Sequence, residues 1–189
     1  MLPPKRVYEN LYQKRYKRHQ QRKKKLIDLL NSRSSQRIFN GKEVEDWKVE
    51  CILEYMAKVP SSCGRQAVYG VVIADRTQKE LLGALLVGGV GWIHRADKII
   101  LLFAAVQAYK EQLFPMPYLD AGAVLATAYL TCEDIGVGCC FVNPNIREEN
   151  KGIFEEKFKS KDFFCGALAI GYYDKKSKPS KKKKSIIIK

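Results

Sequence analysis

The stretch Arg33-Ser34-Ser35-Gln36-Arg37-Ile38-Phe39 carries two guanidinium groups and two hydroxyls within five residues, just after a predicted helix and before an apolar anchor. Arginines at positions i and i+4, with hydroxyls between them, can converge on one dianion because the guanidinium fork matches phosphate oxygens. An anion-binding loop is therefore one interpretation. A solvated helix end with cap-forming serines is the other, and the segment alone leaves both open.

A second polar segment, Val59-Pro60-Ser61-Ser62-Cys63-Gly64-Arg65-Gln66, follows a predicted helix and precedes a predicted strand. Its small residues would let the backbone approach a flat ring system, and the amide of Gln66 would offer hydrogen bonds to ring heteroatoms. An ordinary helix-to-strand loop explains the same pattern.

A third segment, Asp134-Ile135-Gly136-Val137-Gly138-Cys139-Cys140-Phe141, is a predicted helix-to-strand junction. Glycines at such a place usually cap the helix C-terminus. The functional alternative is that backbone N–H groups beside Gly138 point at a ligand.

Hydrophobic patterning around these segments predicts an order of elements α-α-β-α-β-α-β-α-β. The helices are expected at 7–31, 44–58, 77–86, 120–135 and 146–159, and the strands at 68–74, 98–105, 137–142 and 164–173. The dense apolar run 98–105 suits a central strand that is buried on both faces. No phosphate-binding G-x-G-x-x-G lies between the first strand and its helix, so a Rossmann fold has little support.

Composition points to one folded domain with basic ends. The chain has 189 residues, 46% of them apolar, and a net charge of +14. Residues 1–33 carry +9 and residues 174–189 carry +7, whereas the body between them carries −2. No stretch approaches the roughly 20 apolar residues that a membrane span needs, and the basic start leads into more charge rather than into an apolar signal core. We therefore expect a cytoplasmic protein without a membrane segment.

The six cysteines form no C-x-x-C pair, and five of them lie in or beside apolar runs. Buried free thiols in a reducing compartment are the favoured interpretation over disulfides. With only His19 and His94, and no clustered ligand spacing, a structural zinc site has little support. The sequence likewise offers no catalytic triad and no carboxylate pair.

Taken in order, the three segments resemble the nitroreductase family. That family opens with an R-R-S-x-R-x-F/Y element, which Arg33, Ser35, Arg37 and Phe39 match, while Ser34 stands where a second basic residue is common. Its P-S-x-x-N-x-Q-P element matches at Pro60, Ser61 and Gln66, with Gly64 in place of asparagine and Ala67 in place of proline. The family's L-G-L-G turn resembles residues 135–139, and its closing strand and basic stretch resemble residues 169–172 and 178–181.

The resemblance implies an α+β fold, a three-layer sandwich in which helices flank a mixed, mostly antiparallel sheet. It also implies a homodimer that holds FMN at the subunit interface. The FMN phosphate would be bound by Arg33, Ser34, Ser35 and Arg37, with Lys178 and Lys181 as candidates from the tail. The flavin ring and ribityl chain would be lined by Pro60, Ser61, Ser62, Gly64 and Gln66, and the reactive edge would face the backbone near Cys140 and Phe141.

The activity implied is that of an FMN-dependent oxidoreductase, which takes hydride from NADH or NADPH and reduces a nitroaromatic, quinone or similar small-molecule acceptor. The flavin supplies the difficult chemistry, so no catalytic side chain is assigned. The expected boundaries are a basic helical extension at 1–25, the FMN-binding domain at 26–174 and a basic C-terminal arm at 175–189. In that arm, Ile186–Ile188 are expected to pack on the second subunit.

Two other functions remain as alternatives. Basic residues interleaved with tyrosines in the N-terminal extension, together with Lys181–Lys184, would give weak, sequence-blind contact with nucleic acid. A flavin-binding module without turnover is the other alternative, which the change to Gly64 makes possible. Trp92, after a glycine-rich segment, is expected either to stack on a ligand as part of a short lid or to pack in the core.

Overall fold

The computed structural model describes residues 26–109, 115–158 and 161–179. Its helices are α2 (Leu26–Ser32), α3 (Asp46–Ala57), α4 (Arg76–Leu85), α5 (Met116–Ile135) and α6 (Glu148–Phe158). Its strands are β1 (Val68–Ile73), β2 (Lys98–Ala104), β3 (Gly138–Val142) and β4 (Phe163–Gly171). Short 3-10 turns lie at η1 (Ser62–Gly64), η2 (Val87–Gly89), η3 (Ile93–Arg95) and η4 (Val106–Ala108). The element order predicted from the sequence is confirmed over the described residues.

The four strands form one sheet in the order β1-β2-β4-β3, and each neighbouring pair is antiparallel. All seven residues of β2 are buried, which confirms the central strand expected from its apolar run. The expected mixed character is reduced to one parallel bridge, between Ser35 and Cys139 at the free edge of β3. That bridge places the Arg33–Phe39 segment beside β3.

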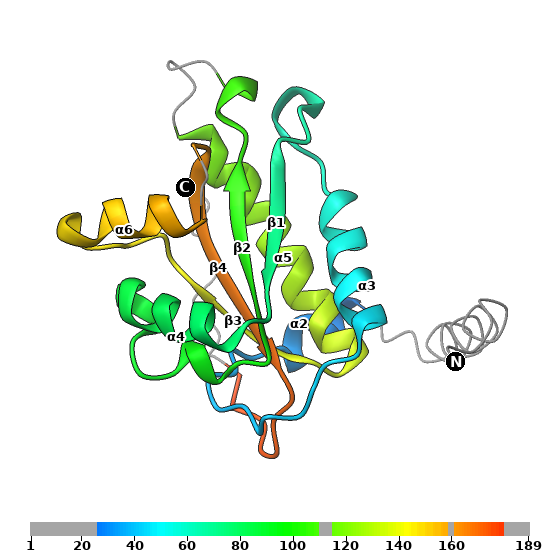
Figure 1. Cartoon of the computed structure of the whole chain (residues 1–189). Helices are drawn as coiled ribbons and strands as arrows, with labels where there is room; N and C mark the ends of the chain where they lie inside the picture. Colours follow the sequence, from blue (N-terminus) through cyan, green and yellow to red (C-terminus); the bar gives the residue numbers. More distant parts are fainter. Residues whose placement is uncertain (1–25, 110–114, 159–160, 180–189) are drawn as a thin grey trace, which may run out of the picture.

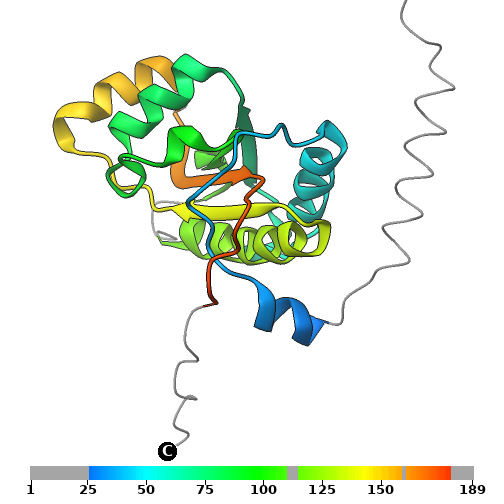
Figure 2. The same ribbon diagram turned by 90° about the horizontal axis from the view of Figure 1, so that it is seen from below.

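Helices cover both faces of the sheet, and each face has its own apolar core. Figures 1 and 2 show α3 and α5 on one side of the sheet and α4 and α6 on the other. Buried side chains of β2 and β4 alternate between the two cores, so that Ile100 and Leu168 face α3 and α5 while Leu101 and Ala169 face the opposite layer. This arrangement is the expected three-layer α+β sandwich.

Helix α5 begins at Met116, four residues before the predicted start. Pro117 lies in its first turn, where the missing N–H costs no helical hydrogen bond. The helix ends at Gly136, whose φ of 72° is left-handed and whose N–H caps the carbonyls of Cys132 and Glu133. The capping interpretation of this glycine is therefore confirmed. The additional turn at the start brings Asp120 inside the helix, a position that matters for the second polar segment.

Some expectations fall on residues that the structure does not describe. These are the helical extension of residues 1–25, Lys181 in the basic tail and the three isoleucines at 186–188. Within the described ranges, no helix is both long and apolar enough to cross a membrane. Five of the six cysteines are buried as thiols, and Cys63 is exposed.

Candidate functional site

The Arg33–Phe39 segment runs in an extended conformation beside β3, held by a hydrogen bond from the backbone nitrogen of Gln36 to the carbonyl of Cys139 at 2.8 Å. Side chains of an extended chain alternate between its two sides. Ser34 and Gln36 point inward and are 6% and 2% exposed, and the amide of Gln36 donates to the Ser34 hydroxyl at 3.0 Å. The structure therefore places Ser34 on the buried inner side of the segment, away from the side that carries Arg33, Ser35 and Arg37.

The other side of the same segment carries the polar groups that remain available. Arg33, Ser35 and Arg37 are half-buried or exposed, and their spacing of two residues places them together on the outer side. The pattern that suggested an anion site thus persists in the folded chain with one hydroxyl rather than two.

Tyr129 of α5 ties this segment to β3. Its hydroxyl accepts a hydrogen bond from the backbone nitrogen of Phe141 at 2.8 Å and lies 3.3 Å from the hydroxyl of Ser35. The guanidinium of Arg33 lies over the Tyr129 ring, 5.3 Å from its centroid. One side chain therefore positions both a candidate phosphate ligand and the strand that was expected to face the flavin. The N–H of Phe141 is committed to Tyr129, which removes it as a donor to a ligand.

Cys140 lies inside this cluster as a buried thiol. Burial raises its pKa, and the opposing effects of Arg37, Tyr129 and Ser35 do not cancel that shift. The thiol is therefore protonated near neutral pH, so it adds no negative charge beside the two arginines.

Trp92 was expected either to stack on a ligand or to pack in the core, and it packs partly in the core. Its indole is half-buried against the core under α4, and its Nε1–H donates to the carbonyl of Gly88 at 2.9 Å. The guanidinium of Arg37 lies over the same ring, 5.8 Å from the centroid. Trp92 thus supports Arg37 from the side of the glycine-rich segment.

The start of the C-terminal arm packs against the inner side of the Arg33–Phe39 segment. The carbonyl of the Gln36 side chain accepts from the backbone nitrogen and the hydroxyl of Ser177, at 3.1 and 2.9 Å. Lys176 forms an ion pair with Glu133 at 2.6 Å. Lys178 lines a surface hollow together with Ile38 and Phe39, so the start of the arm lies beside the Arg33–Phe39 segment. The surface so formed is positive, because Lys176 neutralises the carboxylate of Glu133.

The second polar segment is organised by a buried carboxylate. Asp120 of α5 accepts from the backbone nitrogen of Ser62 at 2.9 Å, from the Ser62 hydroxyl at 2.8 Å and from the Tyr109 hydroxyl at 2.8 Å. Burial by itself would raise the pKa of Asp120, but these hydrogen bonds outweigh it and hold the pKa below its usual value. The Ser62 proton is therefore engaged, so Ser62 can offer a ligand only an acceptor.

The remaining groups of this loop are partly committed as well. The Gln66 amide donates to the carbonyl of Val59 at 3.0 Å, and the Gln66 backbone nitrogen donates to the Ser61 hydroxyl at 2.8 Å. The Ser61 proton and the carbonyl oxygen of the Gln66 side chain are left for a ligand. Gly64 has a φ of 65°, a conformation that both glycine and asparagine adopt readily. The exchange of asparagine for glycine therefore keeps the backbone shape and removes a side chain.

Within one chain, the two polar segments lie on opposite sides of α5. Asp120 holds the second segment and Tyr129 holds the first, and nine residues separate them in the helix. Nine residues make two and a half turns and about 13.5 Å of rise, so the two side chains project in opposite directions. The structure therefore assembles the Arg33 segment, Lys178 and β3 in one place, but it does not bring Ser61 and Gln66 to that place in the same chain.

Sequence reasoning missed Tyr129 and Asp120, the two residues that position both segments. The only signal in the sequence is that each is a polar residue within the alanine-rich helix α5. Such a residue indicates a hydrogen bond inside the fold, since a buried polar group without a partner is costly. It does not say which distant segment provides the partner.

Comparison with known proteins identifies the fold. No family model matches the chain, and no curated protein matches it by sequence. Among solved structures, it resembles an FMN-dependent nitroreductase from Clostridium difficile R20291 with a TM-score of 0.70 and 24% identity, over 82% of this chain and 91% of that one. A nitroreductase with bound FMN from Desulfitobacterium hafniense DCB-2 gives a TM-score of 0.69 and 16% identity, over 86% of this chain and 97% of that one.

A third structure, named for NADH dehydrogenase or NAD(P)H nitroreductase, comes from Bacteroides thetaiotaomicron VPI-5482. It gives a TM-score of 0.74 and 21% identity, over 84% of this chain and 92% of that one. The near-complete coverage of each structure shows that the whole described body has the nitroreductase fold. At these identities the likeness shows the fold alone.

Proposed function

We propose that two copies of this chain bind FMN between them and act as an oxidoreductase, with NADH or NADPH as donor and a nitroaromatic, quinone or similar compound as acceptor. The observation that carries the proposal is the gathering of Arg33, Ser35 and Arg37 on one side of an extended segment, with the arm that carries Lys178 beside that segment. Structures of the same fold whose names include FMN add support.

The donor set of this surface fits a phosphate dianion. Two guanidinium groups and a hydroxyl supply charge-assisted and neutral hydrogen bonds, and a lysine adds a further positive charge. Both arginines are braced by aromatic rings, Arg33 by Tyr129 and Arg37 by Trp92. Such bracing reduces the entropy that long side chains lose when they bind a ligand.

The opposite placement of the two polar segments on α5 supports a homodimer as the binding unit. In a two-fold dimer, Ser61 and Gln66 of one copy can approach Arg33 and Arg37 of the other, which a single chain does not allow. In this arrangement one copy holds the phosphate and the second lines the ring. Pro60 and Ser62 take part through packing and through the loop shape that Asp120 maintains.

When bound, FMN supplies the hydride chemistry. The residues of this chain bind and orient it. Tyr129 fixes Ser35 against β3, and Trp92 supports the Arg37 guanidinium. The protonated thiol of Cys140 keeps the surface positive near neutral pH, which favours the phosphate. No side chain is proposed to act as an acid or base in the reaction.

Purification of the full chain with FMN tests the proposal. A yellow protein that releases FMN on denaturation, and whose flavin is bleached by NADH or NADPH without oxygen and restored by a quinone, is the expected result. A flavin that stays oxidised under excess nicotinamide would favour the module without turnover. A colourless protein that does not take up FMN would overturn the proposal.

A further inference from the structure

Gln36 is a buried glutamine at the point where the Arg33–Phe39 segment meets the C-terminal arm. Its amide nitrogen donates to the Ser34 hydroxyl at 3.0 Å, which fixes the orientation of the amide and leaves its carbonyl oxygen facing the arm. There the oxygen accepts from both donors of Ser177, the backbone nitrogen at 3.1 Å and the hydroxyl at 2.9 Å. We call this contact between Gln36 and Ser177 the arm latch.

Gly138 of β3 provides the room for the arm latch. A Cβ at that position would lie 3.0 Å from the Cβ and the Cγ of Gln36, and 2.6 Å from the ring of Tyr173. Even a methyl group would therefore push both side chains away from the strand. The glycine at the start of β3 thus accommodates Gln36 and, through Tyr173, the residues that lead into the arm.

The segment and the start of the arm run antiparallel, with a hydrogen bond at each end of their contact. The Asn40 side chain donates to Asp174 at 2.9 Å, whereas Gln36, four residues earlier, contacts Ser177, three residues later. The bond of Asn40 is exposed to solvent, and those of Gln36 are partly buried. A shielded hydrogen bond is stronger because water does not compete for it. The arm latch is therefore the better protected of these two ties.

Lys178 directly follows the residue that the arm latch holds. It lines a surface hollow of about 330 Å³ together with Ile38 and Phe39. Because the lysine side chain is a flexible four-carbon stem, its reach toward a bound anion depends on where its backbone is held. The arm latch fixes that position at the preceding residue, Ser177.

We propose that Gln36 is a positioning residue, which holds the start of the arm on the Arg33–Phe39 segment and so places Lys178 for a phosphate dianion bound there. That this phosphate belongs to FMN rests on the proposed function, whereas the contact between Gln36 and Ser177 does not. The Gln36 side chain lies on the buried inner side of the segment, so it acts on the anion through the arm. Arm docking and phosphate binding should then favour each other by the same factor.

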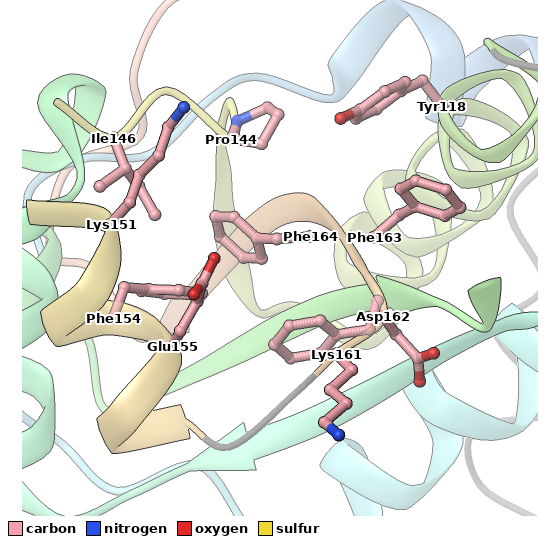
Figure 3. A pocket seen from close by; sticks show the side chains of 11 residues that line it. Tyr118, Pro144, Ile146, Lys151, Phe154, Glu155, Lys161, Asp162, Phe163 and Phe164 are labelled. Carbon is pink, nitrogen blue, oxygen red and sulfur yellow. The ribbon is translucent and has the colours of Figure 1, made fainter. Parts of the chain in front are cut away.

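The arm latch is separate from an aromatic cavity of about 810 Å³ between α6 and the start of β4. Figure 3 shows the rings of Phe154, Phe163 and Phe164 in the wall of that cavity. Of the described residues that line it, none belongs to the Arg33–Phe39 segment or to the arm. A compound bound in the cavity does not contact the arm latch, so hydrogen exchange at the Ser177 amide reports on the latch itself.

Replacing Gln36 by methionine, which has a similar length and no amide, tests the arm latch. In the full chain without added flavin, hydrogen–deuterium exchange at the Ser177 amide should be about tenfold faster or more in Gln36→Met than in wild type. Gln78→Met, at an exposed position of α4, is the matched control and should exchange like wild type. Mass spectrometry of the peptide that contains Ser177 measures the rates.

Ser177→Ala gives a second variant, which changes only the arm and so keeps the test valid if Gln36→Met does not fold. It removes the hydroxyl bond and leaves the backbone bond, so its exchange should be intermediate between those of wild type and Gln36→Met. Exchange as slow as in wild type, in both Ser177→Ala and Gln36→Met, would overturn the arm latch.

Flavin binding tests the positioning role. Gln36→Met should weaken FMN about tenfold and leave the affinity for riboflavin, which lacks the phosphate, unchanged. In wild type, FMN should slow exchange at Ser177 and riboflavin should not, as reciprocal coupling requires. Equal FMN dissociation constants in Gln36→Met and wild type, or an equal loss of FMN and riboflavin, would overturn the positioning role.

Lys178→Ala identifies the charge that the arm latch places. In that background, Gln36→Met should cost little further FMN affinity, because both changes remove the same contact. Fully additive losses would overturn the role of Lys178. A wild-type chain that binds neither FMN nor riboflavin would overturn the proposed function and the positioning role with it, whereas faster exchange at Ser177 in Gln36→Met would still establish the arm latch.

Discussion

Ser35 and Tyr129 meet hydroxyl to hydroxyl, with 3.3 Å between their oxygens, although 94 residues of chain separate them. Tyr129 also accepts the N–H of Phe141, so one phenol joins the candidate phosphate ligand to β3. When Tyr129 donates to Ser35, the proton of Ser35 remains available for a bound anion. In that arrangement the contact both holds the serine and leaves its proton for the anion.

Replacing Tyr129 by phenylalanine tests this link. The variant leaves the N–H of Phe141 without its acceptor, which should lower the free energy of unfolding by about 1–3 kcal/mol. Ser35→Ala keeps the bond between Tyr129 and Phe141 and should cost less, about 0.5–1.5 kcal/mol. Urea unfolding of both variants and of the double variant measures the coupling. A Tyr129→Phe protein as stable as the wild type would show that the phenol is dispensable.

Arg37→Ala tests the phosphate site. Because Arg37 is exposed and packs on the ring of Trp92 at the surface, its removal should leave the fold intact and reduce FMN affinity by about 1.5–3 kcal/mol, the value of hydrogen bonds to charged groups. Quenching of flavin fluorescence gives the dissociation constant. Arg95→Ala removes an exposed charge outside the site and serves as the control. Equal constants for Arg37→Ala and wild type would remove Arg37 from the site.

Asp120 should make stability depend on pH in acid. Its folded-state pKa is lowered, so its stabilising contribution is full above the unfolded pKa of about 3.9 and is lost as the pH falls through the folded value. Asp120→Asn should therefore lower the free energy of unfolding at pH 7 by about 1–3 kcal/mol. The difference from wild type should shrink as the pH falls below about 4.

Urea unfolding at a series of pH values measures this difference. Asp28→Asn, at an exposed position of α2, is the control and should differ little from wild type at any pH. A gap between Asp120→Asn and wild type that stays constant into acid would mean that the Ser62 and Tyr109 bonds do not depend on the charge.

Deleting residues 185–189 tests the proposed role of the arm. The three isoleucines at 186–188 favour an extended strand, and exposed they would invite aggregation. If they pack on the second copy, the deletion should raise the dimer dissociation constant and weaken FMN binding together, as linkage requires. Sedimentation and flavin occupancy measure the two effects. An unchanged dimer with full flavin would show that these residues are dispensable.

Hydrophobic periodicity was enough to predict the order of the elements over the described residues. The run 98–105 is apolar throughout because both faces of its strand are buried, so the local sequence alone predicts a buried strand there. The start of α5 was predicted four residues too late, and two prolines, Pro115 and Pro117, lie at its true start. A proline in the first turn of a helix costs no hydrogen bond, so local pattern alone is ambiguous there.

For the candidate site, the sequence by itself determined which polar and charged groups are present, and the structure added that their segment is extended. The alternation of an extended chain separates Arg33, Ser35 and Arg37 from Ser34 and Gln36. Only the tertiary structure decided that Tyr129 and Asp120 hold the two polar segments, and that these lie on opposite sides of α5. The physical reason is that contacts between residues far apart in sequence depend on how helices and strands pack. The sequence around one residue of such a pair does not show which residue its partner is.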